Sequence, residues 1–239
     1  MPPLDVVGTT PVLIVGTGDV VRGELWLSNP GAADLKLTGA TITVTLPTGA
    51  EAGPIPLPPD VVIPALGVRR MIVEMGMQPL TPPDTYPAVL DLVTSAGNQG
   101  IPASMVVTAV SAPVIVPDRV IFDGVAASDV VSGSVVVRND GNVPITVGPM
   151  ADEPLLEVRA HPRVLAVGTG GALVVEPAVG LAPTGTATFT NDTPTIAPGG
   201  WAAVAFQLTA PATLATNAHL RALPRIGTER FAVDLLTVP

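Results

Sequence analysis

The chain has 239 residues, of which 47% are hydrophobic, with a net charge of −9 and no cysteine. This length accommodates two domains that each bury a core, and the hydrophobic content argues against disorder. The acidic balance disfavours nucleic acid and anionic membranes as partners, and the lack of cysteine excludes disulfides, thiolate metal sites and thiol nucleophiles.

Glycine and proline are abundant, with 24 and 28 residues, and they separate short apolar runs rich in Val, Thr and Ile. Such runs between turn residues are typical of β-strands, and no long stretch shows the periodicity of an amphipathic helix. The chain is therefore predicted to be all-β, stabilised by burial and strand pairing.

One stretch, residues 19–31, recurs 110 residues later as residues 129–141. Both copies carry Asp, Val-Val, Gly, Asn and Gly at the same spacing, with alternating apolar residues between them. A repeat of this size is a domain period rather than a solenoid unit. We expect two copies of one β module, at residues 1–112 and 113–239, joined by a short, stiff linker.

In the first module, the repeated stretch reads as a strand with two distinct faces. The predicted inward residues are Val21, Gly23, Leu25 and Leu27, and the predicted outward residues are Arg22, Glu24, Trp26 and Ser28. Further strands are expected at residues 12–15, 35–37, 41–46, 71–75, 89–93 and 101–110. Residues 51–62 are interpreted as a connection, and residues 97–100 as the turn of a hairpin.

The second module repeats this plan from Arg119 onward, and it ends in a hairpin of residues 219–223 and 231–238. The offset between matching positions grows from 110 at Asn29 to 133 at Ile63, so the second module carries about 23 extra residues. They fall within residues 151–195, which are predicted to hold an inserted β-hairpin. Long insertions in β-sandwiches are common places for function.

The pattern Asp-x-x-x-Gly-x-apolar-x-apolar-x-Asn-x-Gly resembles the second strand and following turn of bacterial immunoglobulin-like modules, both cell-adhesion-related and Hydin-type. Residues 84–90 and the Pro198-Gly199 pair add to the resemblance, and Tyr86 stands where such sandwiches often place a corner tyrosine. The resemblance implies two tandem immunoglobulin-like antiparallel β-sandwiches. Members serve as spacers, adhesins, chaperones and particle proteins, so the fold leaves the function open.

Groups suited to catalysis or metal binding are sparse. His161 and His219 each lack a second histidine at ligand spacing, and the carboxylates fall mostly at turns, where Asp satisfies backbone amides. Residues 139–142 superficially resemble a calcium loop without its later Glu. The glycines of residues 168–171 lie between two apolar strands, whereas a phosphate loop precedes a helix. We therefore predict no enzymatic activity, no cofactor and no metal site.

Outward tryptophans are the main candidates for interaction, because Trp buries a large area at little cost in entropy. The inserted hairpin supplies further candidates. The predicted interface residues are Trp26, Arg22, Trp201, His161, Arg163, Leu165 and Val167. The alternative is that each Trp packs under a neighbouring loop or against the other module.

The leading hypothesis is a non-enzymatic structural protein, a building block or decoration of a phage or virus-like particle. Its partners would be copies of itself or a shell or tail protein. The N-terminus lacks the basic and apolar segments of a signal peptide, so synthesis in the cytoplasm and residence in a particle are expected. The alternatives are a cell-surface adhesin or spacer, extracellular if the chain is a fragment, and an accessory carbohydrate-binding module. Few aromatic residues count against the last.

Overall fold

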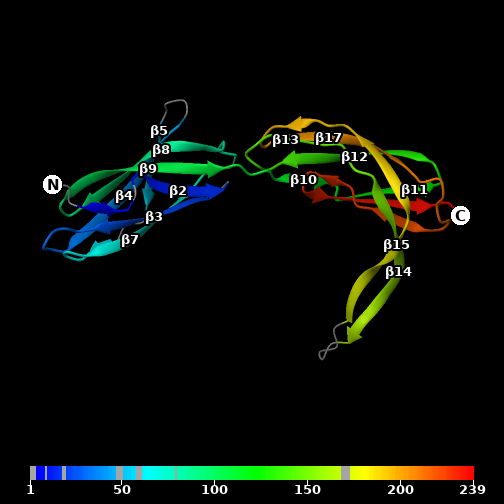
Figure 1. Cartoon of the computed structure of the whole chain (residues 1–239), viewed down its shortest axis with the longest axis horizontal. Helices are drawn as coiled ribbons and strands as arrows, with labels where there is room; N and C mark the ends of the chain where they lie inside the picture. Colours follow the sequence, from blue (N-terminus) through cyan, green and yellow to red (C-terminus); the bar gives the residue numbers. More distant parts are fainter. Residues whose placement is uncertain are drawn as a thin grey trace. The chain divides into compact units, whose positions relative to one another are not determined.

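The structure is a computed structural model that describes residues 4–8, 10–17, 20–46, 51–57, 61–78, 80–167 and 173–239, with backbone alone at 51–52, 54, 57, 159–167 and 173–183. Within these ranges the regular elements are all β-strands, which confirms the predicted class. The chain forms two compact units (Figure 1). The first comprises Met1–Val110 and Gly141–Val143, and the second comprises Ser111–Asp140 and Pro144–Pro239.

The described part of the first unit contains nine strands in one continuous sheet that curls around a core. They are β1 (Asp5–Val7), β2 (Val12–Thr17), β3 (Val20–Ser28), β4 (Leu35–Thr45), β5 (Glu51–Leu57), β6 (Val61–Ile63), β7 (Val68–Gly76), β8 (Asp84–Thr94) and β9 (Gly97–Thr108). The order is β1-β3-β2-β9-β8-β4-β5, with β6 beside β4 and β7 beside β3. Strands β2 and β9 pair in parallel.

The described part of the second unit contains an eight-stranded sheet in the order β10-β12-β17-β15-β14-β18-β21-β11 and two small two-stranded sheets, β13-β16 and β19-β20. Its strands are β10 (Pro113–Val116), β11 (Arg119–Val125), β12 (Val130–Asn139), β13 (Ile145–Thr146), β14 (Glu153–Val167), β15 (Leu173–Asn191), β16 (Thr195–Ile196), β17 (Trp201–Thr209), β18 (His219–Ala222), β19 (Arg225–Ile226), β20 (Glu229–Arg230) and β21 (Ala232–Thr237). Strands β11 and β21 pair in parallel.

The two units share one pairing plan. Strand β3 pairs with β7 as β12 pairs with β17, and β8 pairs with β9 as β18 pairs with β21. In each unit an early strand also runs parallel to the last strand, β2 beside β9 and β11 beside β21. The repeat seen in the sequence therefore coincides with these recurring strand pairings, although in the described residues β2 pairs with β3 in the first unit alone and the long hairpin joins β17 in the second alone.

The predicted two-sided pattern of β3 is confirmed. Val21, Leu25 and Leu27 are at most 3% exposed, whereas Trp26 is 44% exposed. The inward residues of β3 pack into one hydrophobic cluster with those of β4, β7, β8 and β9. Alternation along each strand thus directs one apolar row to the core and leaves the other row for solvent or partners.

The repeated asparagine, Asn29 or Asn139, bonds to the segment at Ile63 or Ile196, which is the other position at which the two units match in sequence. The Nδ2 atom of Asn29 donates to the carbonyl oxygens of Ala33, Ile63 and Pro64, at 2.8, 3.2 and 3.1 Å. In the second unit the Nδ2 atom of Asn139 donates to the carbonyl oxygen of Ile196 at 3.1 Å. Both side chains are buried. The spacing shared by the two repeats therefore reflects a structural clamp, an Asn side chain that satisfies buried carbonyl groups.

Four phenylalanines meet in the core of the second unit, where the first unit has aliphatic residues and methionine. The ring of Phe206 lies 6.3, 6.2 and 5.6 Å, centroid to centroid, from those of Phe122, Phe189 and Phe231. Gly133 leaves room for this cluster, because a Cβ there would lie 2.9 Å from ring atoms of both Phe122 and Phe206. In the second unit, packing thus requires the first of the two glycines that the repeats share.

Two predictions about the first unit are wrong. Residues 51–62, interpreted as a connection, contain β5 and β6. Strand β5 pairs only with β4, at the edge of the sheet, where a proline that lacks an N–H is tolerated. The turn between β8 and β9 is formed by Ser95 and Ala96, because Thr94 lies opposite Gly97, so residues 97–100 belong to β9.

Candidate functional site

The outer surface of β1, β2, β3 and β7 gathers exposed apolar side chains around Trp26, and we call it the Trp26 face. Trp26 lies between Val7 on β1 and Arg70 on β7. The exposed large apolar residues of these strands are Val7, Leu13, Val15, Val20, Trp26, Val68 and Ile72, each at least 40% exposed. Exposed apolar side chains gathered on one face make it a candidate interaction surface.

Two ion pairs cross the middle of the Trp26 face. Arg70 donates to Oε2 of Glu24 from Nε at 2.9 Å and from Nη2 at 2.5 Å. The Nε atom of Arg22 lies 3.9 Å from Oε2 of Glu74. Because all four side chains are about half exposed or more, these pairs contribute little to stability. Their effect is to balance charge within the face.

Trp201 lies on the outer face of the second unit, at the start of β17, and is 67% exposed. It stands opposite Arg138 on β12, and Ala203 and Ala205 follow it on the same face. The predicted outward orientation of both tryptophans is confirmed. Trp26 lies on β3 of the β3–β7 pair, whereas Trp201 lies on β17 of the equivalent β12–β17 pair.

The insertion predicted within residues 151–195 is a long hairpin of β14 and β15. Their pairing runs from Glu153 opposite Ala187 to Val167 opposite Leu173. Near its base, β15 pairs with β17 and β14 pairs with β18, and farther out the described strands pair only with each other (Figure 1). The predicted turn at residues 168–171 lies outside the described residues. So do the side chains of His161, Arg163, Leu165 and Val167.

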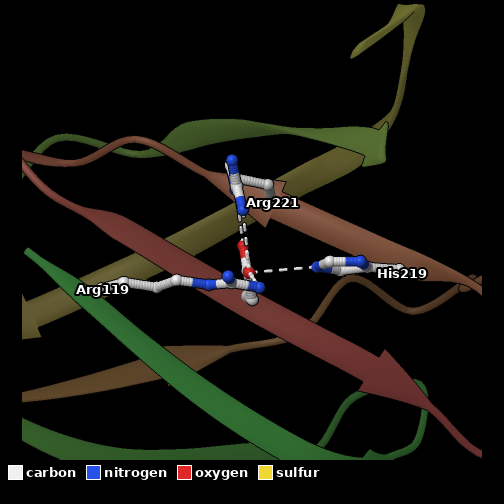
Figure 2. Close-up of polar contacts among 4 residues, drawn as sticks. Arg119, His219 and Arg221 are labelled. Carbon is white, nitrogen blue, oxygen red and sulfur yellow. Dashed lines mark hydrogen bonds and ion pairs between the residues drawn. The ribbon is translucent and has the colours of Figure 1, made fainter. Parts of the chain in front are cut away.

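A buried carboxylate, Asp234 on β21, lies among the side chains of Arg119, Arg221 and His219 in the second unit. Arg221 binds it with two hydrogen bonds, Nε to Oδ1 at 2.7 Å and Nη2 to Oδ2 at 3.0 Å. Arg119 forms an ion pair with Oδ2. Figure 2 shows Arg119, His219 and Arg221 pointing at the carboxylate from different sides.

The fourth member of this cluster, His219, is oriented less favourably. Its Nε2 atom lies 3.0 Å from Oδ2 of Asp234 but has no hydrogen-bond partner of good geometry among the described residues. The contact therefore acts as an ion pair when the imidazole is protonated. A His–Asp pair can serve a nucleophile, but within the described part of the chain no hydroxyl is hydrogen-bonded to Nε2 of this imidazole.

The surroundings of Asp234 keep it ionised. Burial raises its pKa, but the contacts from Arg221, His219 and Arg119 outweigh burial and lower the pKa to about 2. The same contact raises the pKa of Arg221. Asp234 lies on β21, Arg119 on β11 and Arg221 on β18, so the cluster ties the last strand of the unit to both neighbours. We interpret the Asp234 cluster as a structural feature that stabilises the pairing of β21 with β11 and β18.

Asp234 is not among the site residues predicted above, although the sequence contains a pattern that indicates its role. The run Val233-Asp234-Leu235-Leu236 places one carboxylate inside an apolar strand, and Arg221 occupies the facing position of the predicted last hairpin. Opposite charges at facing positions of two apolar strands indicate a cross-strand pair. Arg119 on a distant strand was not predictable in this way.

The calcium-like loop at residues 139–142 has its polar groups engaged elsewhere. Asp140 accepts two hydrogen bonds from Arg138, at 2.6 and 2.7 Å. Asn142 donates from Nδ2 to the carbonyl oxygens of Thr81 and Thr108, both at 3.0 Å. Within the described ranges no cluster of three or more His, Cys, Asp and Glu could hold a metal ion. Nor does any described helix have the length and apolarity to cross a membrane.

No protein-family model and no curated protein matches the chain. Solved structures resemble it remotely. Pseudomonas fluorescens alkylpurine DNA glycosylase AlkC, bound to DNA containing an abasic-site analogue, gives a TM-score of 0.32 at 16% identity, over 46% of this chain and 31% of that chain. The PapD-like domain 7 of human CEP192 gives 0.31 at 10%, over 53% and 84%. The CupB2 chaperone of Pseudomonas aeruginosa gives 0.29 at 10%, over 94% and 97%.

The chain thus spans about a third of the length of the glycosylase chain. All three TM-scores lie below 0.5, and these likenesses carry no argument about fold family or activity.

Proposed function

We propose that the chain is a tandem pair of immunoglobulin-like sandwiches that works as a non-enzymatic building block of a larger protein assembly, binding copies of itself through the Trp26 face. The immunoglobulin-like assignment is supported by the recurring strand pairings and by Tyr86. Its buried hydroxyl donates to the carbonyl oxygen of Pro82 at 2.7 Å, as a corner tyrosine does.

The observation that carries the proposal is the composition of the Trp26 face. Seven exposed apolar side chains surround two Arg and two Glu residues whose charges cancel, and Asp5, opposite Ser28, adds one negative charge at the edge of the face. A chain with a net charge of −9 repels its own copies. A face with balanced charge in its middle avoids this repulsion, and its alternating Arg and Glu can pair across two copies.

The area of the Trp26 face predicts that each contact between two copies is weak and that an assembly is held by many such contacts. Strand β3 has nine residues. Strands β1 and β2 pair with different halves of β3, and β7 pairs with its whole length, so the face is three strands wide. At about 3.3 Å per residue and about 4.8 Å per strand it covers about 400 Å². Two copies would bury about 800 Å² in total, below the roughly 1,200 Å² of a stable complex. Many such contacts in one assembly hold together through multivalency.

Sedimentation velocity of the full chain tests the proposal. We expect weight-average mass to rise between about 1 µM and about 500 µM, the range over which a weak dimer changes population. Trp26→Glu, which places a charge on the face, should hold the chain monomeric. Val89→Glu is the matched control, since Val89 on β8 is 45% exposed and Trp26 is 44% exposed. A wild-type chain that stays monomeric, or equal effects of the two variants, would contradict the proposal.

A phage or virus-like particle remains the proposed setting for such an assembly. The genes adjacent to this one provide the test: capsid or tail genes support the proposal, and secretion genes contradict it.

A surface adhesin or spacer is the second candidate, and the long β14–β15 hairpin favours it. Beyond its base the described part of the hairpin makes no pairing with the body of the unit, which suits an arm that reaches a partner. Shortening the hairpin should abolish binding to a cell surface and leave sedimentation unchanged if this candidate is correct.

A further inference from the structure

A shallow groove of about 360 Å³ lies on the outer side of β12, β17 and β15 in the second unit. Cross-strand register places its polar side chains. Ser132, Gln207 and Thr190 form one polar row, and Ala205 and Asp192 lie beside it, since the N–H of Asp192 bonds to the carbonyl of Ala205. The groove therefore runs across three paired strands.

The side chains of the groove offer hydrogen-bonding groups that the protein itself does not use. Ser132, Thr190, Gln207 and Asp192 are all exposed. Within the described part of the chain, none of their side chains has a hydrogen bond or ion pair. Such groups supply both donors and acceptors, and Asp192 adds a charged acceptor.

The side chain of Asn191 fixes the backbone beside Asp192 through three hydrogen bonds. The Oδ1 atom of Asn191 accepts from the N–H of Met150 at 2.7 Å, and its Nδ2 donates to the carbonyl oxygens of Gly148 and Asp192, at 3.1 and 2.7 Å. A binding group on a fixed backbone loses little entropy when a ligand arrives.

An aromatic platform lies farther along the same face. Ala205, Ala203 and Trp201 succeed one another on the outer side of β17, and all three are exposed. Four residues of strand separate Trp201 from Ala205, which is about 13 Å. Between the polar groove and the indole ring of Trp201, which is 67% exposed, the outer side of β17 presents only small alanines, with Val136 of β12 opposite Ala203.

This combination of groups selects a class of ligand. Hydroxyl, amide and carboxylate groups match a ligand rich in hydroxyls, and an exposed indole packs against an apolar ring face. A phosphate or nucleic acid ligand would need free cations. The nearest cation on this face, Arg138 beside Trp201, is bound to Asp140 by two hydrogen bonds.

We propose that the outer face of β12, β17 and β15 binds a neutral oligosaccharide longer than one sugar ring. Ser132, Thr190, Gln207 and Asp192 bond its hydroxyls, and Trp201 stacks on a ring about 13 Å away along the strand. This site lies on a different unit from the Trp26 face and is independent of the proposed assembly.

The chain has two tryptophans, so the Trp26→Phe variant leaves Trp201 as the sole indole. Fluorescence titration of this variant with cellohexaose, maltohexaose, xylohexaose and chitohexaose tests the site. We expect at least one of these probes to shift the Trp201 emission in a saturable manner. An unchanged emission with all four overturns the proposal.

Calorimetry of the full chain separates the contributions. Trp201→Ala and Asp192→Ala should each weaken binding of the active probe at least about tenfold, a loss typical of one stacking or charged hydrogen-bond contact. Trp26→Ala is the matched control and should leave affinity unchanged. Loss of binding in Trp26→Ala alone overturns the proposal. So does a Trp201→Ala variant that binds the saccharide normally but no longer self-associates, because the face is then a protein interface.

Discussion

Replacing Asp234 by Asn should destabilise the second unit strongly while leaving its shape unchanged. The side chain is fully buried between Arg119, Arg221 and His219. Lowering the pKa from 3.8 to about 2 corresponds to about 2.5 kcal/mol of stability, at about 1.36 kcal/mol per pKa unit. Breaking a buried ion pair by removing one partner costs about 3–5 kcal/mol. We therefore expect the free energy of unfolding at neutral pH to fall by about 2.5–5 kcal/mol.

The lowered pKa of Asp234 also predicts how the stability of the second unit depends on pH. Because the folded-state pKa of Asp234 is lowered, its contribution is fully present above its ordinary pKa of 3.8 and is lost as the pH falls toward about 2. The wild-type unit should therefore lose about 2.5 kcal/mol over that interval from this group. The Asp234→Asn variant should lack this part of the acid sensitivity.

Urea unfolding followed by Trp201 fluorescence, in the Trp26→Phe background, reports on the second unit alone. Asp140→Asn is the matched control, because Arg138 also binds Asp140 with two hydrogen bonds, but at the surface. Its effect should be much smaller, since solvent screens exposed pairs. Equal losses in the two variants would refute the role assigned to burial. An unaltered acid profile in Asp234→Asn would refute the assigned pKa.

Other substitutions test the internal packing by urea unfolding, followed by Trp26 fluorescence in the Trp201→Phe background for variants of the first unit and by Trp201 fluorescence in the Trp26→Phe background for variants of the second. Asn29→Ala and Asn139→Ala should each cost about 1–3 kcal/mol, because buried carbonyl groups lose their donor; a neutral effect would contradict the clamp. Gly133→Ala should cost about 1–3 kcal/mol, because its Cβ would crowd two phenylalanine rings. Gly148→Ala, which meets nothing within 4 Å, should change stability by less than about 0.5 kcal/mol. Tyr86→Phe should cost about 1 kcal/mol through the lost hydrogen bond; an equally stable variant would remove its corner role.

Alternation along the chain was enough to predict most strands and the direction of both tryptophans. Period-two patterns such as Val21, Leu25 and Leu27 depend only on which face meets the core. The prolines of residues 51–62 misled the prediction, because their tolerance depends on an edge position that only sheet order defines.

Contacts between strands that lie far apart in the chain could not be predicted from local sequence patterns. Arg119 reaches Asp234 through a parallel pairing between strands more than 100 residues apart, and no local pattern encodes such a partner. The repeated Asn was visible as a motif, but its role required knowing that Asn29 and Ile63 lie side by side. The groove on β12, β17 and β15 likewise exists only once three strands are in register.

The fluorescence of Trp26 tests the central claim of self-association most directly. In a Trp201→Phe variant Trp26 is the sole indole, and in the single chain it is 44% exposed. Assembly through the Trp26 face predicts that its emission shifts to the blue as the concentration rises from about 1 µM to about 500 µM. An emission that stays at the solvent-exposed position throughout this range would contradict the claim.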